Sequence, residues 1–203
     1  MFKTMTKAER TKQFILETAA TIYNEKGLAG TGVDDVLAAT GLTKGCLYSH
    51  FENKEDLTLQ VADYLLKKTC DGMGKLLGGS GTVKERLFAY LDANKLPLRP
   101  AIQGGCPTFN LAVEADDNQP VVKQKVSEAL GKALQLLVAL LQEGIRKKEF
   151  SPSLDAAAFA FKLLAATEGA TVICRITDTN KPMQGLIKGL KTELEGYCVQ
   201  AKK

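Results

Sequence analysis

The stretch 33–51, VDDVLAATGLTKGCLYSHF, constrains what this chain can fold into more than any other part of it. It predicts two short helices, over 33–40 and 44–50, joined by a tight turn. Gly41 follows the first helix at the position where a left-handed backbone ends a helix at low cost. Two short helices joined in this way are typical of a helix-turn-helix, whose second helix enters the major groove of DNA.

Polar residues mark the start of each of these two helices. Thr31 is expected to cap the first one, whose first turn carries Asp34 and Asp35. Carboxylates at that end of a helix suit the positive end of its dipole. Thr43 is expected to cap the second helix, because a threonine hydroxyl can accept a hydrogen bond from a free N–H of the first turn.

The second helix is short, about 10 Å at 1.5 Å per residue, and its two sides differ. Leu47 and Phe51 lie four residues apart and are expected to anchor its inner face. The residues left to face outward or sideways are Lys44, Gly45, Cys46, Tyr48, Ser49 and His50. After it, Asn53 is expected to cap another helix. Lys54 stands at the start of that helix, beside free N–H groups that suit a phosphate.

Each outward residue also has a plain structural interpretation. Lys44 alone would be a solvated surface lysine, His50 a helix-end residue and Tyr48 a half-buried core residue. Gly45 would be a weak point that costs about 1 kcal/mol relative to alanine inside a helix. A short helix that contains a glycine and exposes its polar side is unfavourable unless that face has a partner. The combination therefore favours contact with DNA.

The sequence also resembles a known family at these residues. The run TGVDDVLAATGLTKGCLYSHFENKEDL, Thr31–Leu57, is similar to the DNA-binding domain of the tetracycline-repressor (TetR) family, with a specific K-G-x-L-Y-x-H-F-x-x-K pattern over 44–54. The resemblance covers about 6–65 closely and the rest only in helical plan. It implies a dimeric, all-helical transcriptional regulator with a ligand-responsive C-terminal domain. One departure is Cys46, at a position where the family varies because it faces the DNA.

The candidate DNA-binding residues follow from the pattern and the resemblance together. Tyr48 and Lys54 are expected to contact phosphates. Base contacts are expected from the start of the second helix, for example apolar contact with a thymine methyl group. A dimer would place two such helices about 34 Å apart, or a multiple of that, on a near-palindromic operator. The full candidate set is Thr31, Thr43, Lys44, Gly45, Cys46, Tyr48, Ser49, His50 and Lys54, with Thr43, Gly45 and Cys46 as the expected base readers.

Bulk charge does not argue for nucleic acid. The formal net charge is +4 over 203 residues. Residues 1–54 hold seven lysines and arginines against six acidic residues, which gives only +1. Affinity for DNA must therefore come from a few placed cations, doubled in a dimer.

The composition also limits the cellular setting and the cofactors. No stretch of 18 apolar residues is present, so no membrane span is expected, and the N-terminal segment lacks the apolar core of a signal peptide. The five cysteines are widely spaced and odd in number, with no CxxC, and the single histidine is His50. Neither a metal site, nor a cofactor, nor a disulfide framework is expected, and reduced thiols fit a cytoplasmic protein.

The rest of the chain predicts an all-α protein of about nine helices. A capping box, Thr6 with Glu9, starts the first helix and Gly27 ends it. The expected helices span 7–26, 33–40, 44–50, 53–77, 82–96, 107–115, 120–148, 153–177 and 182–199. The first three form a head, and we expect a DNA-binding domain over 6–52 and a ligand-binding and dimerisation domain over 53–203. The segment 156–166 is apolar nearly all round and is expected to be covered on several sides.

The last expected helix has two distinct faces. Its apolar stripe runs through Met183, Leu186, Ile187, Leu190, Leu194, Tyr197 and Cys198. Gly185, Gly189 and Gly196 lie on another face, where glycine lowers stability unless a second backbone approaches. We therefore expect the last two helices to pair with their copies as a four-helix dimer seam. The alternative is that the glycines merely weaken a surface helix.

An unidentified small-molecule effector is expected to bind among the body helices, through an apolar lining with a few polar groups. The candidate residues are Gln103, Cys106, Phe109, Asn110, Leu137, Thr167, Glu168 and Thr171. Cys106 precedes Pro107 at a helix N-terminus, where the dipole favours a thiolate. It is interpreted either as a redox or electrophile sensor, or as a pocket wall, or as a small packed residue.

Two other function classes compete with a ligand-released repressor. An enzyme is disfavoured, because the sequence shows no paired carboxylates, no Cys/His set and no cofactor loop. The glycine run 78–81 lacks the GK[ST] ending of a phosphate-binding loop. An activator, or a regulator that binds DNA without a ligand, stays open.

Overall fold

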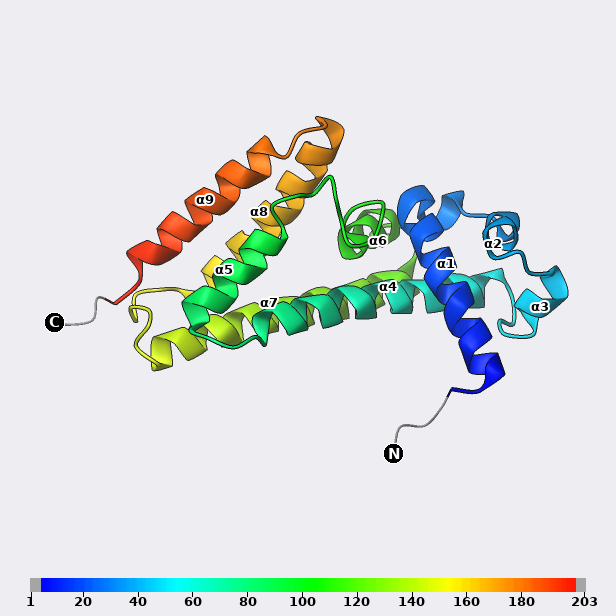
Figure 1. Ribbon diagram of the computed structural model, residues 1–203, viewed down its shortest axis with the longest axis horizontal. Coiled ribbons are helices and arrows are strands. Elements are labelled where there is room, and N and C mark those ends of the chain that lie inside the picture. Colours follow the sequence, from blue (N-terminus) through cyan, green and yellow to red (C-terminus); the bar gives the residue numbers. More distant parts are fainter. Residues whose placement is uncertain (1–4, 200–203) are drawn as a thin grey trace. The chain divides into compact units, whose positions relative to one another are not determined.

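The computed structural model describes residues 5–199, and every regular element in that range is a helix (Figure 1). This confirms the all-α class, and the nine described helices match the expected number. In chain order they are α1 (Lys7–Gly30), α2 (Val33–Thr40), α3 (Lys44–Tyr48), α4 (Lys54–Leu77), α5 (Val83–Ala93), α6 (Pro107–Ala115), α7 (Pro120–Arg146), α8 (Ala156–Ile176) and α9 (Lys181–Gly196).

Local capping explains where most helices begin. The capping boxes at Thr6 and Thr82 both form, each with the hydroxyl and the third-residue glutamate bonded reciprocally. The expected start of α8 at residue 153 is wrong. Asp155 caps this helix instead, with its carboxylate accepting hydrogen bonds at 3.0 Å from two free N–H groups of the first turn. The expected ends of α5 and α7 also lie two or three residues too far along.

The chain divides into two compact units. The first holds the described residues through Lys68 together with Ile102–Ser127, and the second holds Thr69–Ala101 and the described residues from Glu128 onward. Helices α4 and α7 each run from one unit into the other. The first unit includes α6 because α6 packs against α1. The expected boundary after residue 52 separates DNA binding from ligand binding and dimerisation, not two compact units. It stays a prediction.

Buried apolar side chains from four helices fill the interior of the first unit. Ile15 of α1, Val36 of α2, Leu47 of α3 and Leu57 of α4 have no exposed surface. Burial of each such side chain contributes about 1.5–3 kcal/mol. Tyr23 of α1 is also buried, which raises the pKa of its hydroxyl, and that hydroxyl lies 3.1 Å from the Thr58 hydroxyl oxygen. The short helices are therefore held by α1 and the first part of α4.

The second unit packs α5, α8, α9 and the later part of α7 around an apolar core. Phe150, Leu163 and Leu194 have no exposed surface there. The predicted apolar stripe of the last helix is confirmed, because its residues are buried or half-buried against this core. The face with Gly185, Gly189 and Gly196 is exposed.

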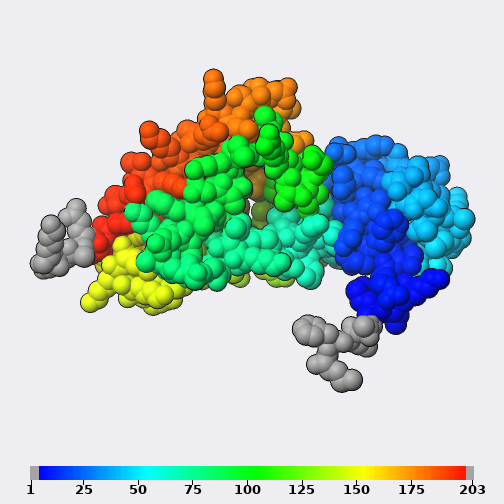
Figure 2. All heavy atoms as spheres, viewed as in Figure 1, coloured from blue at the N-terminus to red at the C-terminus, as the bar shows by residue number. Residues whose placement is uncertain are grey.

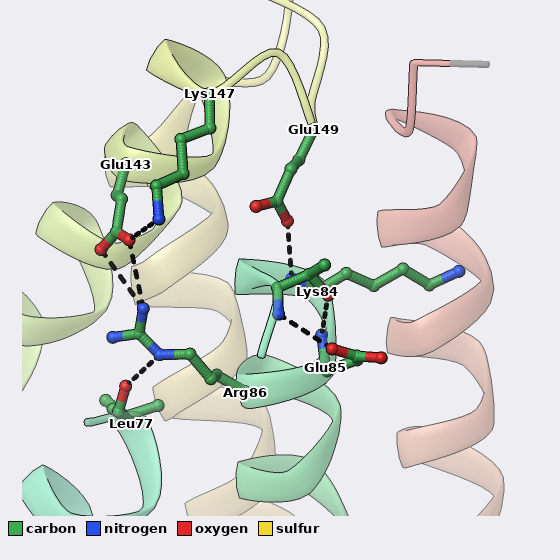
Figure 3. A network of polar contacts seen from close by, with 8 residues as sticks. Leu77, Lys84, Glu85, Arg86, Glu143, Lys147 and Glu149 are labelled. Carbon is green, nitrogen blue, oxygen red and sulfur yellow. Dashed lines mark hydrogen bonds and ion pairs between the residues drawn. The ribbon is translucent and has the colours of Figure 1, made fainter. Parts of the chain in front are cut away.

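A polar network ties three helices of the second unit together (Figure 3). The Arg86 guanidinium donates from Nε to the Leu77 carbonyl at 2.6 Å and from Nη1 to the Glu143 carboxylate at 3.2 Å. Lys147 donates to the same carboxylate at 2.7 Å. The hydrogen bond from Lys147 and the nearby Arg86 charge hold the pKa of Glu143 below its usual range. Arg86 thus joins the C-terminal end of α4 to α5 and α7.

The described residues of this chain cover the apolar segment 156–166 of α8 on one side only, and the expected cover on its other sides stays a prediction. Phe161 is 64% exposed and Ile176 is 80% exposed, whereas Leu163 on the opposite face has no exposed surface. Helix α8 is also long and apolar enough to cross a membrane. In its most apolar stretch of 18 residues, 39% is buried inside the chain. One long apolar face of this helix therefore has no cover in a single chain.

Two glycines of α7 make a matched test of packing. A Cβ added at Gly144 would collide with the Phe150 ring, whereas one added at Gly131 would meet nothing within 4 Å. We expect Gly144→Ala to lower the free energy of unfolding by about 1–3 kcal/mol through overpacking. Gly131→Ala should raise it by about 0.5–1 kcal/mol, because alanine loses less backbone entropy in a helix. Urea unfolding measures both, and an equal effect of the two changes would contradict the packing described.

Candidate nucleic-acid interface

The turn between α2 and α3 forms as the sequence predicts. Gly41 adopts φ 67°, in the left-handed region, and its N–H donates to the Leu37 carbonyl at 2.9 Å. The Thr43 hydroxyl accepts a hydrogen bond from the N–H of Cys46 at 3.2 Å and caps α3. Helix α3 ends at Tyr48, two residues earlier than expected, and the Ser49 hydroxyl donates to the Cys46 carbonyl at 2.7 Å. The helix-turn-helix is thus closed at both ends by local bonds.

The structure corrects the role expected for Thr31. Its side chain has no exposed surface, and its hydroxyl donates to the Gly27 carbonyl at 2.7 Å. The N-cap of α2 is Gly32, whose N–H donates to the Asp35 carboxylate at 2.8 Å. Thr31 therefore neither caps α2 nor reaches the surface of this chain, and we leave it out of the candidate interface.

The two sides of α3 differ as expected. Leu47 has no exposed surface and Phe51, just beyond the helix, is 1% exposed. Tyr48 is 37% exposed, and its hydroxyl makes no hydrogen bond within the described residues. The other outward side chains are exposed or half-exposed; they are Thr43, Lys44, Cys46, Ser49 and His50.

Gly45 has no structural reason to be glycine within this chain. A Cβ added there would meet nothing within 4 Å, and its φ lies outside the left-handed region. Gly41, by contrast, needs glycine for its backbone conformation. The first turn of α3 therefore presents bare backbone at the surface, which lets another molecule approach it closely.

Two lysines without an ion pair in the described structure stand near this surface. Lys44 is exposed at the start of α3, and Lys54 is exposed at the start of α4. Asn53 caps α4 as predicted, since its side-chain oxygen accepts a bond from the N–H of Asp56 at 2.8 Å. The Asp35 carboxylate is already bonded to Lys26 at 2.6 Å, and this bond, followed by the one from the Gly32 N–H, holds the pKa of Asp35 below its usual range.

The end of α1 is broken at Gly27 and completed by a residue from α6. Gly27 adopts φ 79° and ψ 170°, which interrupts the helix. The Glu114 carboxylate accepts hydrogen bonds from the N–H groups of Leu28 and Ala29, each at 2.7 Å. Glu114 therefore acts as an N-cap for the short turn after the break, although it lies more than 80 residues away in sequence.

A second set of polar contacts joins α6 to α1 at Asn24, which is 5% exposed. The Asn24 amide donates to the Gln103 carbonyl at 2.6 Å, and the Asn110 amide donates to the Asn24 side-chain oxygen at 2.9 Å. A Cβ at Gly104 would lie 2.5 Å from the Asn24 carbonyl oxygen, so this close approach requires glycine. Sequence reasoning missed this clasp; Asn110 and Glu114, four residues apart on one face of α6, were its only local signal.

The predicted effector residues of the first unit take part in this clasp or lie beside it. Gln103 and Asn110 are bonded as described above. Cys106 is the N-cap residue of α6, half-exposed, and makes no capping bond with its side chain. Phe109 is half-buried. A ligand-binding role for these four residues stays a prediction.

The predicted effector residues of the second unit lie on α7 and α8. Leu137 has no exposed surface and belongs to the core. Thr167 is buried, and its hydroxyl donates to the Leu163 carbonyl at 2.9 Å within its own helix. Glu168 and Thr171 are half-exposed on α8. Their role in ligand binding also stays a prediction.

The described residues offer little for metal or disulfide chemistry. They contain no group of three or more His, Cys, Asp or Glu side chains that could hold a metal ion. All five cysteines are free thiols. Burial raises the pKa of the Cys70 thiol, so that cysteine is less reactive than an exposed one.

Comparison with known proteins gives matches along most of the chain. The family model described as bacterial regulatory proteins of the tetR family matches residues 15–61, and the one described as a tetracyclin repressor-like C-terminal domain matches residues 83–190.

Individual proteins match over nearly their whole length. A TetR-family transcriptional regulator from Cytophaga hutchinsonii is 34% identical, with 98% of this chain and 100% of that one covered and a TM-score of 0.86. A TetR transcriptional regulator from Chloroflexus aurantiacus J-10-FL is also 34% identical, with 97% and 100% covered and a TM-score of 0.90. The HTH-type transcriptional repressor DhaR from Mycobacterium sp. (strain GP1) is 28% identical, with 85% of this chain and 86% of DhaR covered.

The Glu114 cap can be tested by a substitution that keeps the shape of the side chain. We expect Glu114→Gln to lower the stability of the first unit by about 1 kcal/mol, because one amide oxygen cannot replace a charged carboxylate that accepts two N–H groups. Asp117→Asn is the matched control, since it removes an exposed acid just after α6. Hydrogen exchange of the Leu28 and Ala29 amides reports the cap. Unchanged exchange in Glu114→Gln would show that the cap does not hold this turn.

Proposed function

Because this chain belongs to the TetR family of bacterial regulatory proteins, we propose that it is a homodimeric repressor that binds a near-palindromic operator and is released from it by a small ligand. The matches themselves identify the chain as a helix-turn-helix transcriptional regulator of this family. The family is not an enzyme family, and the sequence offers no catalytic constellation.

The exposed face of α3 is the observation that carries the proposal. One turn of bare backbone at Gly45, a tyrosine with a free hydroxyl and an unpaired lysine stand together on a helix whose other face is buried. A five-residue helix is too short to be stable by itself. The rest of the chain therefore holds α3 in place, although the exposed polar face of α3 contributes nothing to the packing. This face would fit the major groove of DNA.

The contacts divide into two kinds. Tyr48 and Lys54 would position the head on phosphates, together with Lys44 and free N–H groups at the start of α4. Thr43, Gly45 and Cys46 would meet base edges, because they lie in the first turn of the helix that enters the groove. Ser49 and His50 flank the same surface. Such contacts are few, so affinity would depend on two heads binding at once.

The dimer would form through α8 and α9. The uncovered face of α8 is apolar and includes Phe161, Ala165, Val172 and Ile176. On α9, a Cβ at Gly185, Gly189 or Gly196 would meet nothing within 4 Å. No neighbouring atom of the described chain therefore requires glycine at these positions. An apolar face beside a flat glycine face suits close packing against the same pair of helices of a second copy. Pairing would also explain why α8 is apolar enough to resemble a membrane span.

Release by a ligand needs a physical link between body and head. A ligand shifts an equilibrium only by its different affinity for the two states. The clasp at Asn24 and the cap by Glu114 bind α6 firmly to α1. A ligand that displaces α6 would therefore displace the head, and so the spacing between two heads. Cys106 at the start of α6 stays the predicted sensor if the signal is an oxidant or electrophile rather than a bound molecule.

Activation, or DNA binding without an effector, is the alternative that the family leaves open. The relative DhaR is named a repressor, which favours repression for this chain. An operator–reporter assay separates the two outcomes by the sign of the response. In either case we place the protein in the cytoplasm, where the DNA is.

Tyr48 tests the interface most cleanly, because its hydroxyl has no partner in the described structure. The operator is first selected from random duplex DNA with the natural protein. We expect Tyr48→Ala to weaken binding to that operator at least tenfold in a gel shift, since it removes both the phosphate contact and the rigid ring. Tyr48→Phe should lose less, because only the hydroxyl is removed.

The controls separate binding from assembly. Sedimentation should show natural protein and both variants as dimers of equal stability, because Tyr48 lies far along the chain from α8 and α9. Lys75→Gln, which changes an exposed lysine of α4 outside both proposed interfaces, should bind the operator as the natural protein does. Unchanged affinity of Tyr48→Ala would remove this residue from the interface, and a monomeric natural protein would contradict the proposed assembly.

A further inference from the structure

A groove in the second unit is lined by residues that the proposed function does not use. It lies between α5, the residues just after α5, and α9, with a volume of about 710 Å³. Figure 2 shows the surface of α5 in green beside that of α9 in orange and red. None of the predicted effector residues lines it. On the α9 side the groove is lined by residues 184, 188, 191 and 195. These lie beside the face of α9 that carries Gly185, Gly189 and Gly196.

The groove has an apolar side. Phe88 of α5 is half-buried there, and Leu96, just after α5, is 45% exposed. Ile187 lies at the floor without exposed surface of its own. An exposed leucine beside an aromatic ring leaves apolar surface in water, which a ligand with an apolar part would cover favourably.

Positive charge is concentrated around the same ring. The ammonium groups of Lys191 and Lys84 lie 4.7 Å and 5.1 Å from the centre of the Phe88 ring. Asp92 is shared by two lysines, since it accepts from Lys191 at 2.6 Å and also pairs with Lys95.

The carboxylates of the groove do not balance its lysines. Glu195 is paired with Lys84 at 2.9 Å. Lys188 lines the groove with no ion pair in the described part of the chain. Three lining lysines, at positions 95, 188 and 191, therefore meet two carboxylates, at positions 92 and 195, which leaves a net charge of +1, and the Lys84 ammonium lies beside the same ring. Both carboxylates are already engaged, so they do not repel an incoming anion as free ones would.

We propose that this groove is a second ligand site, for a small amphipathic carboxylate. Lys188 and Lys95 hold its carboxylate, and Phe88 and Leu96 cover its apolar part. A bare inorganic anion would use only the lysines, and a neutral lipid only the apolar side, so neither fits both halves of the groove. The site is independent of the proposed DNA-binding function, and it would stand if that function failed.

The test uses octanoate as the probe and the full chain without DNA. Equilibrium dialysis with radiolabelled octanoate should show saturable binding. Lys188→Gln should weaken it roughly tenfold, because a charge-assisted hydrogen bond is lost. Lys95→Gln with Lys188→Gln should weaken it further. Lys181→Gln, which removes an exposed lysine of the same helix outside the groove, should leave the affinity unchanged.

A neutral analogue completes the test. Octan-1-ol should compete with octanoate at least tenfold less well than unlabelled octanoate does. Lack of saturable binding, equal competition by octan-1-ol, unchanged affinity in Lys188→Gln, or an equal loss in Lys181→Gln would each overturn the proposal. Thermal unfolding of each variant is followed in parallel, and Lys188→Gln should unfold as the natural protein does, since no described contact depends on that lysine.

Discussion

The burial of Leu47 and Phe51 is the contact on which the functional surface depends. Helix α3 has five residues, and a helix of that length is not stable in water by itself. Its cap at Thr43 satisfies one N–H, which contributes about 1 kcal/mol. Burial of one leucine and one phenylalanine, with the Lys12 ammonium of α1 over the Phe51 ring, contributes more. Packing of the inward face of α3 therefore holds the helix in place. The residues on its outward face take no part in that packing and can contact a partner.

Helices α4 and α6 carry the connection between this surface and the rest of the chain. The first part of α4 lies in the core of the first unit through Leu57 and Val61, and its end is held in the second unit by Arg86. Helix α6 follows a segment of the second unit directly, yet it is bound to α1 by Asn110 and Glu114. Polar contacts fix geometry more sharply than apolar ones, because they are directional. A displacement of α6 would thus be transmitted to α1.

Much of the fold could be predicted from sequence because its signals are local. The capping boxes, Gly41 as a left-handed turn and Thr43 as a cap all act within four residues, and all are confirmed. Thr31 was misjudged because its hydroxyl has a nearer acceptor in the Gly27 carbonyl, which only appears once α1 breaks. The expected start of α8 is wrong because the Ser151 and Ser153 hydroxyls are bonded to each other in the turn before the helix, which leaves Asp155 to cap it.

The rest depends on contacts that no local pattern records. The cap by Glu114 joins residues more than 80 positions apart. An apolar helix such as α8 has the same sequence pattern whether its faces pack on its own chain or on another one. The groove beside Phe88 gathers lysines from α9 and from the chain just after α5, and no single segment shows that excess of charge. The exposure of the candidate DNA-binding residues could be predicted because they follow one another along the chain, and their contact with DNA stays a prediction.

The proposed function requires two copies of α3 to lie in major grooves on one face of the same operator. Hydroxyl-radical footprinting on an operator selected from random DNA measures this directly. We predict two protected segments, related by a two-fold axis, with centres about 34 Å or a whole multiple of that apart along one face of the duplex. A single protected segment, or protection without any symmetric pair, would contradict it.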